Sequence, residues 1–502
     1  MLLWALCGMV ALLCWCWVRL RWLAVRGYWA RRGVPHEPPH PLLGSLTFLM
    51  RENPAIWFRR MYSRFPGAQC VGIWSLWRPG LLVHSPDLAR RVLVTDFHCF
   101  TDRYIGCDHD PNGRHALFST NNPFWSLIRK KMTGAFTSAK LKSMHDIITS
   151  KTKDLVERVK DEIDEGNSTI DLWRLFADFN TDVISEALLG VRSEAARRGA
   201  SPLRRVTSQF NQASLYKTLA WNCLFFLPPV SKLLRLPFLP REALVPLRHM
   251  FDAVVAQRGG GGGGAGRSDP PADLMDFIMS IERGAHTSET HADIMFAQTS
   301  ALLQAGYDTT TLTLSFMLYE LAFSCEAQEK LHQELVEAKE MINNQEFDST
   351  LLSELPYLNC CIKETLRKYP IMSWLDRVTT RQCQVEGATL PAGTPVYVNV
   401  AGLHHDPALF PEPERFRPER FLPHAEPALQ PYSYLPFGEG PRQCIGKRFA
   451  LQTLRWSLAA LALRYAVRPA PAAPPPARCP LHSSGVLIMP GIPLLLQFLH
   501  RQ

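Results

Sequence analysis

The hydrophobic pattern begins with an uncharged N-terminal stretch. Residues 1–18 carry no charge, and five arginines follow between residues 19 and 32. This length is close to the lower limit for a helix that spans a bilayer. In a cleavable signal peptide the basic residues precede the apolar ones, whereas here they follow them. The pattern predicts a membrane anchor at residues 1–18, with the rest of the chain on the cytosolic side. A buried apolar helix is the alternative.

A second apolar stretch covers residues 294–319 and contains one charged residue, Asp308. Because a helix that is apolar on all sides is normally buried, this stretch predicts a buried helix that crosses a domain. An isolated buried carboxylate is costly unless it has a partner or a task. Gly306 lowers helix stability by about 1 kcal/mol relative to alanine, and we expect it to leave room for a ligand beside the helix.

Elsewhere the apolar positions predict amphipathic and buried helices with a minor sheet. Residues 19–44, which include a proline-rich segment at 35–41, predict a basic, stiff hinge. The aromatic residues between 219 and 240 either dip into a bilayer surface or pack in the core. The glycine-rich run at 259–266 predicts a flexible loop.

Composition narrows the class of protein. With 46% hydrophobic and 20% charged residues, the chain can bury a large core. Its thirteen cysteines are an odd number without a repeated spacing, which favours a reducing compartment over a disulfide framework. The formal net charge of +9 suits an acidic partner or an anionic membrane. We expect no nucleic-acid partner.

The most specific chemistry lies at residues 437–446, which read Phe-Gly-Glu-Gly-Pro-Arg-Gln-Cys-Ile-Gly. Gly440 and Gly446 lack a Cβ, so the backbone can approach a flat macrocycle and direct N–H groups at the Cys444 sulfur. A thiolate that is kept dry and oriented can hold haem iron. Phe437 can exclude solvent, and Arg442 can pair with a haem propionate. A buried structural cysteine beside a turn is the alternative.

This segment matches the signature of the cytochrome P-450 superfamily at Phe437, Gly438, Gly440, Arg442, Cys444 and Gly446. The chain therefore resembles a microsomal haem-thiolate monooxygenase, and looks most like the insect family six detoxification enzymes. The resemblance implies the cytochrome P-450 fold, which is mainly α with a minor β region and forms a helix-rich single domain with small antiparallel sheets. It also implies haem b with Cys444 as the axial ligand of the iron.

Three further residues are predicted to bind the cofactor. Trp125 and Arg129 are four residues apart, so on a helix they share one face and can reach one propionate. A surface cation stacked on an aromatic ring is the alternative. Arg377 occupies the position where the family has an arginine for the second propionate, although it can also be a turn arginine.

Asp308 and Thr309 are the predicted catalytic residues of the buried helix. By resemblance, Thr309 hydrogen-bonds a bound oxygen molecule or a water, and Asp308 relays protons from outside. The alternative is a buried helix whose threonine hydroxyls bond back to the preceding turn.

Glu364 and Arg367 form an (i, i+3) pair on a predicted helix. With Arg420, they resemble the family's buried Glu/Arg/Arg network behind the haem, which is structural. An ordinary surface ion pair, worth about 0–1 kcal/mol, is the alternative.

The implied activity is NADPH-dependent insertion of one atom of dioxygen into lipophilic substrates, either xenobiotic or endogenous. Because the haem-site residues lie between positions 125 and 444, we expect them to converge in one catalytic domain, residues 45–502. The sequence has no flavin or nicotinamide fingerprint, so the electrons must come from a partner. The resemblance implies NADPH-cytochrome P-450 reductase, with cytochrome b5 as a second candidate, at the endoplasmic reticulum membrane, with the catalytic domain facing the cytosol.

Two other functions stay open at this point. The first is a haem-thiolate isomerase or dehydratase of hydroperoxides, against which Asp308 and Thr309 argue, because that chemistry needs no proton relay. The second is a non-catalytic, membrane-tethered haem-binding or ligand-binding protein.

Overall fold

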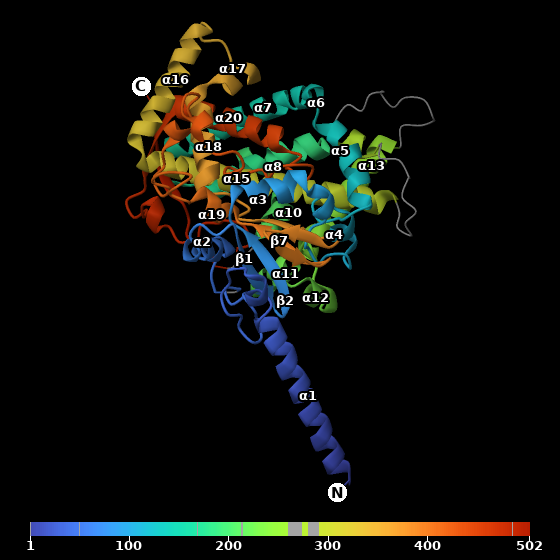
Figure 1. The fold of residues 1–502 in the computed structure, drawn as a ribbon. Coiled ribbons are helices and arrows are strands. Elements are labelled where there is room, and N and C mark those ends of the chain that lie inside the picture. Colours follow the sequence, from blue (N-terminus) through green and yellow to red (C-terminus); the bar gives the residue numbers. More distant parts are fainter. Residues whose placement is uncertain are drawn as a thin grey trace.

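The computed structural model describes residues 2–49, 51–167, 169–211, 214–259, 274–279, 291–483 and 485–501. Helix α1 (Leu2–Arg26) projects as a single rod from a helix-rich body (Figure 1). Within the described ranges it is the one helix long and apolar enough to cross a membrane, and none of its apolar window is buried. The helix continues beyond the uncharged stretch and includes Arg19, Arg21 and Arg26.

Most of the body is helical. The longer helices are α7 (His145–Asp164), α8 (Leu172–Leu189), α13 (Arg241–Gly259), α15 (His291–Phe323), α16 (Cys325–Met341), α18 (Pro356–Lys368) and α20 (Lys447–Arg464). The shorter helices are α2 (Pro54–Arg64), α3 (Pro86–Arg90), α4 (Pro111–His115), α5 (Phe124–Thr133), α6 (Ser138–Ser143), α9 (Ala195–Arg198), α10 (Pro202–Asn211), α11 (Leu215–Phe226), α12 (Pro228–Leu233), α14 (Leu274–Met279), α17 (Ser349–Glu354) and α19 (Val400–His404). The predicted glycine loop lies outside the described residues from position 260 onward.

Three small sheets complete the body. The largest has the strand order β1 (Cys70–Ser75), β2 (Arg78–Val83), β7 (Pro395–Val398), β4 (Leu375–Val378). The others are β3 (Thr169–Asp171), β9 (Leu495–His500), β8 (Tyr465–Pro469), and the pair β5 (Cys383–Val385), β6 (Ala388–Leu390). All pairs are antiparallel except β2 with β7. A parallel pair is possible there because a long connection separates the two strands.

Helix α15 is the buried helix that the apolar stretch predicted, extended at both ends. It packs against α4, α8, α18 and α20 and runs through the body (Figure 1). Between residues 294 and 322 its side chains are buried except at Leu302, Ala305, Gly306 and Thr309. These four positions lie on one helical face. We call this face the open stripe of α15.

Helices α11 and α12 lie at the end of the body from which α1 projects (Figure 1). The aromatic rings of Phe225, Phe226 and Phe238 are buried in the core, whereas Leu215 and Leu233 are 77% and 81% exposed. Of the two alternatives for this region, core packing therefore holds for these aromatic side chains. The two exposed leucines lie at the start of α11 and at the end of α12.

Candidate active site

Residues 437–446 form a closed loop directly before α20. The amide of Cys444 donates to the carbonyl of Phe437 at 2.9 Å. Gly440 has a φ of 76°, and a Cβ at this position would clash with the carbonyl oxygen of Leu93. Both the left-handed conformation and the close approach require glycine. The sequence of the loop thus determines how Cys444 is presented.

The Cys444 thiol lies in an environment prepared for a negative charge. Cys444 keeps exposed surface, but the protein packed around its sulfur raises the pKa of this thiol, while hydrogen bonds from the amides of Gly446 and Lys447 and the nearby cations of Arg129 and Lys447 lower its pKa. The positive end of the α20 helix dipole lies at the same place. A thiol with a raised pKa stays protonated at neutral pH until a metal cation binds it. The loop is therefore suited to a metal-bound thiolate.

Three arginines from different parts of the chain lie within electrostatic reach of Arg103, which is in the loop before α4. They are Arg129 from α5, Arg377 from β4 and Arg442 from the cysteine loop. We call these four arginines the arginine cluster. Burial, together with the charge of Arg103, lowers the pKa of Arg129, that of Arg377 to about 9 and that of Arg442 to about 8. Because arginine keeps its proton in proteins, these shifts reflect the cost of holding four positive charges together.

Two carboxylates offset part of this charge. Asp376 accepts from Arg103 Nη1 at 2.7 Å, and Asp102 lies 4.0 Å from Arg442 Nη2. In the described part of the chain, the Nε atoms of Arg103 and Arg377 are buried without a hydrogen-bond partner. Four guanidinium groups thus face two carboxylates. Since uncompensated buried charge is costly, the arginine cluster suits a ligand that carries two negative charges.

Trp125 holds one member of the cluster in place. The guanidinium of Arg442 lies 4.2 Å above the centre of the buried Trp125 ring, which is a favourable cation–π contact. Arg442 also donates to the carbonyls of Thr101 at 2.6 Å and Thr120 at 3.0 Å. The prediction paired Trp125 with Arg129, whereas the guanidinium over the Trp125 ring is that of Arg442.

Arg103 is a site residue that the sequence did not reveal. It lies in an irregular segment without a motif, and its place in the cluster depends on its ion pair with Asp376, 273 residues away in the chain. The available signal was weak: Arg103 falls in a region that precedes the Trp125 helix and contains other charged residues. Only the folded chain shows that its charge adds to that of the predicted arginines.

Gly306 is partly exposed on the open stripe, and it also allows a close contact with a neighbouring helix. A Cβ at Gly306 would come within 2.6 Å of Ile184 Cδ1, on the neighbouring helix α8. The absence of a side chain therefore lets α8 approach α15 closely. The most exposed position on the open stripe is the preceding residue, Ala305.

Asp308 and Thr309 lie on different faces of α15. Thr309 is part of the open stripe, and its hydroxyl donates to the Ala305 carbonyl at 2.7 Å. This is the back-bonded arrangement that the sequence left open as the alternative. Asp308 is 1% exposed and lies on the buried side of the helix. The structure thus places only Thr309 on the stripe.

The Glu364, Arg367 and Arg420 side chains form the predicted buried network. Arg367 makes two hydrogen bonds with Glu364, at 2.8 and 2.9 Å, and Arg420 Nε lies 3.0 Å from Glu364 Oε2. Arg367 also donates to the carbonyls of His404 and Pro413. The network therefore ties α18 to the segment that leads to the cysteine loop, and the surface-pair alternative is excluded.

Comparison with known proteins agrees with this geometry. The family model "Cytochrome P450" matches residues 34–496. The chain belongs to the cytochrome P450 family. Cytochrome P450 6k1 of Blattella germanica is 30% identical over 93% of this chain and 92% of its own length. Probable cytochrome P450 6a18 and probable cytochrome P450 6v1 of Drosophila melanogaster are 30% and 32% identical, over 92% and 86% of this chain and 93% and 87% of their own lengths.

This cytochrome P450 is accordingly a haem-thiolate monooxygenase with the family's helix-rich fold. The residues present fit the cofactor that the family uses. Haem is flat and carries an iron ion and two propionates. The cysteine loop offers a sulfur surrounded by hydrogen-bond donors, which suits the iron. The arginine cluster has four positive charges and two carboxylates, so the two propionates would balance its remaining charge.

Proposed function

We propose that this cytochrome P450 uses electrons from NADPH to insert one atom of dioxygen into lipophilic substrates. The proposal rests on one observation: the Cys444 thiol, which is suited to metal binding, lies near an arginine cluster that is suited to binding two propionates. In this proposal, residues 1–18 form the anchor, residues 19–44 the hinge and residues 45–502 the catalytic domain.

In the proposed complex, the Cys444 thiolate would hold the iron of haem b. The residues proposed to hold the propionates are Trp125, Arg129, Arg377, Arg442 and, in addition, Arg103. Phe437, which is half-buried beside Lys447, shields the sulfur from water. When bound, the haem supplies dioxygen activation and oxygen transfer. The protein orients the cofactor and keeps the sulfur dry.

Asp308 and Thr309 are proposed to deliver protons to the reacting oxygen. Thr309 lies on the open stripe, but its hydroxyl proton is directed at the Ala305 carbonyl. Rotation about χ1 would turn this proton toward the stripe, since a threonine side chain has more than one staggered rotamer. Asp308 lies on the buried side of the helix. Transfer of a proton from Asp308 to the open stripe therefore requires either a movement of its side chain or a bridging water molecule.

The proposed location is the endoplasmic reticulum membrane, with the catalytic domain in the cytosol. Helix α1 has apolar side chains that the body does not cover, and its arginines lie toward the body, as the positive-inside bias requires. Helices α11 and α12, which carry the exposed Leu215 and Leu233, lie at the same end of the body. Contact of this end with the bilayer would bring lipophilic substrates close to the domain.

The proposed electron donor is a membrane-bound flavoprotein reductase, with cytochrome b5 as a second donor. Lys130 and Lys131 follow Arg129 on α5, and Lys447 and Arg448 follow the cysteine loop. Lys447 Nζ lies 5.8 Å from the centre of the Phe437 ring, so this charge is next to the loop. A basic surface at this place can steer an acidic partner toward the cofactor.

Turnover assays test the proposal. We expect oxygenated product with the purified protein, reductase, NADPH and a panel of lipophilic substrates. A haem-thiolate isomerase would convert hydroperoxides without reductase or NADPH. A ligand-binding protein would show a normal haem spectrum but no NADPH-dependent product. Either result would overturn the proposed monooxygenase reaction.

A further inference from the structure

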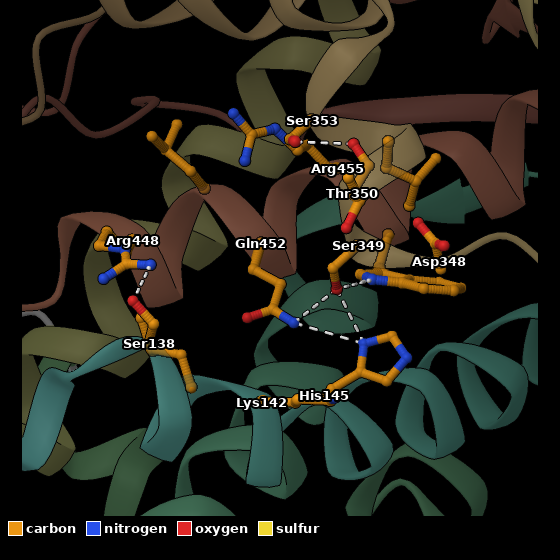
Figure 2. A pocket seen from close by; sticks show the side chains of 14 residues that line it. Ser138, Lys142, His145, Asp348, Ser349, Thr350, Ser353, Arg448, Gln452 and Arg455 are labelled. Atoms are coloured by element: carbon orange, nitrogen blue, oxygen red, sulfur yellow. Dashed lines mark hydrogen bonds between the residues drawn. The ribbon is translucent and has the colours of Figure 1, made fainter.

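A polar groove between α6, α7, α17 and α20 lies outside the proposed haem site and shares Arg448 with the basic surface proposed to attract the reductase (Figure 2). Its volume is about 790 Å³. The polar and charged side chains that line it include Ser138, Lys142, His145, Ser349, Arg448 and Arg455. They come from three regions of the chain that the fold brings together.

The groove carries an excess of positive charge. Arg448 and Arg455 are seven residues apart on α20, so both lie on the helical face that lines the groove. Lys142 adds a third cation, and Asp348 is the one carboxylate among the lining residues. Burial lowers the pKa of Arg455, which means that its charge is partly removed from water. A partly desolvated cation is stabilised by a bound anion.

Many hydrogen-bond donors of these cations are available. Arg448 Nη2 donates to Ser138 Oγ at 3.0 Å, and Arg455 Nε donates to Asn359 Oδ1 at 2.8 Å. A guanidinium group has five N–H donors. No other hydrogen bond of these two guanidinium groups is found within the described ranges. Each arginine therefore keeps donors for a ligand while one bond fixes its position.

A hydrogen-bonded network forms a rigid floor for the groove. Ser349 Oγ accepts from Gln452 Nε2 at 2.9 Å and from Trp456 Nε1 at 3.4 Å. Its own proton is therefore donated to His145 Nδ1, 2.9 Å away. This direction places the ring proton of His145 on Nε2. Figure 2 shows Ser349 between Gln452 and His145. Such a network fixes the side chains around the groove before a ligand arrives.

We propose that this groove binds a phosphorylated small molecule. The cationic side chains approach from α20 on one side and from α6 on another, and the hydroxyl of Thr350 on α17 lies on a third. A tetrahedral phosphate accepts hydrogen bonds from such divergent directions, whereas a planar carboxylate accepts them mainly in one plane. The volume exceeds that of a phosphate ion, and the partly exposed Leu451 offers apolar surface for an organic group.

Direct binding to the haem-loaded, full-length protein in detergent tests this proposal. The probes are inorganic phosphate, adenosine monophosphate and acetate, measured by calorimetry at constant ionic strength set with chloride. We expect saturable binding of both phosphates, tighter for adenosine monophosphate, and none of acetate. If phosphate alone binds equally well, the groove is a site for free phosphate. That outcome would overturn the proposal that the groove binds a phosphorylated organic molecule.

The variants are Arg448→Gln and Arg455→Gln, alone and together. Each should weaken phosphate binding by at least about tenfold, because a hydrogen bond between charged groups is lost. Arg464→Gln is the matched control, since it removes the same charge from the exposed end of α20. An unchanged haem spectrum shows that each variant is folded.

Three results would contradict the inference: no saturable phosphate binding, undiminished binding in the double variant, or an equal loss in Arg464→Gln. A further result would assign the groove to a different occupant. If the wild-type protein binds no phosphate, but the double variant slows haem reduction by the reductase, the groove is a docking surface for an acidic protein.

Discussion

Replacement of Arg377 by methionine removes one positive charge from the arginine cluster but keeps a long side chain that can pack in the same place. The Arg377 pKa falls from the ordinary arginine range above 12 to about 9, which corresponds to roughly 5 kcal/mol of unfavourable free energy for the buried charge. A propionate at this place would offset that cost. Arg377→Met should therefore not destabilise the haem-free protein through loss of charge, but it should weaken haem retention.

The expected effect on the haem-loaded protein is large enough to measure. Loss of a hydrogen bond between charged groups costs about 1.5–3 kcal/mol, which corresponds to haem release about 10 to 100 times faster. The assay follows haem transfer to an excess of an apo-globin by the change in absorbance. Arg381→Met is the matched control, because Arg381 is exposed and lies four residues further along the same segment. Equal release rates for both variants would refute the assignment of Arg377 to the cofactor.

Three further predictions address the other parts of the site. Thr309→Ala should release more peroxide per NADPH and leave substrate binding nearly intact; unchanged coupling across several substrates would assign proton delivery to a water or to Thr310. Charge reversal at Lys131 and Lys447 should slow reductase-driven haem reduction and flatten its salt dependence, while peroxide-driven turnover stays largely unchanged; equal losses in both assays would indicate a damaged haem pocket. Glu364→Gln should lower the free energy of unfolding in urea by about 3–5 kcal/mol, because it leaves buried arginine charge unpaired; a loss below about 1 kcal/mol would mean that the network is not stabilising.

The cysteine loop could be predicted from the sequence because its chemistry is local. Gly440, Arg442 and Cys444 lie within a few residues of one another, and the backbone requirement at Gly440 depends on a conformation that few other residues adopt. The long buried helix was likewise predictable, since its apolar composition leaves one structural solution. In both cases, short-range physical chemistry determined the structure.

The parts that could not be predicted depend on contacts between distant segments. Arg103 joins the cluster through Asp376, and no local pattern marks that partnership. Gly306 indicated a close approach, and the structure shows that the approaching group is Ile184 of α8. A glycine in a buried helix shows that something comes near, whereas only the fold shows what it is.

The carbon monoxide spectrum of a Cys444 variant tests the central claim most directly. Thiolate ligation shifts the Soret band of the ferrous carbon monoxide complex strongly to the red. The variants Cys444→Ser and Cys444→Ala should lose this shifted band, and Cys479→Ser, at the half-buried Cys479, serves as the matched control and should retain it. Retention of the shifted band in either Cys444 variant would contradict the assignment of Cys444 as the haem ligand.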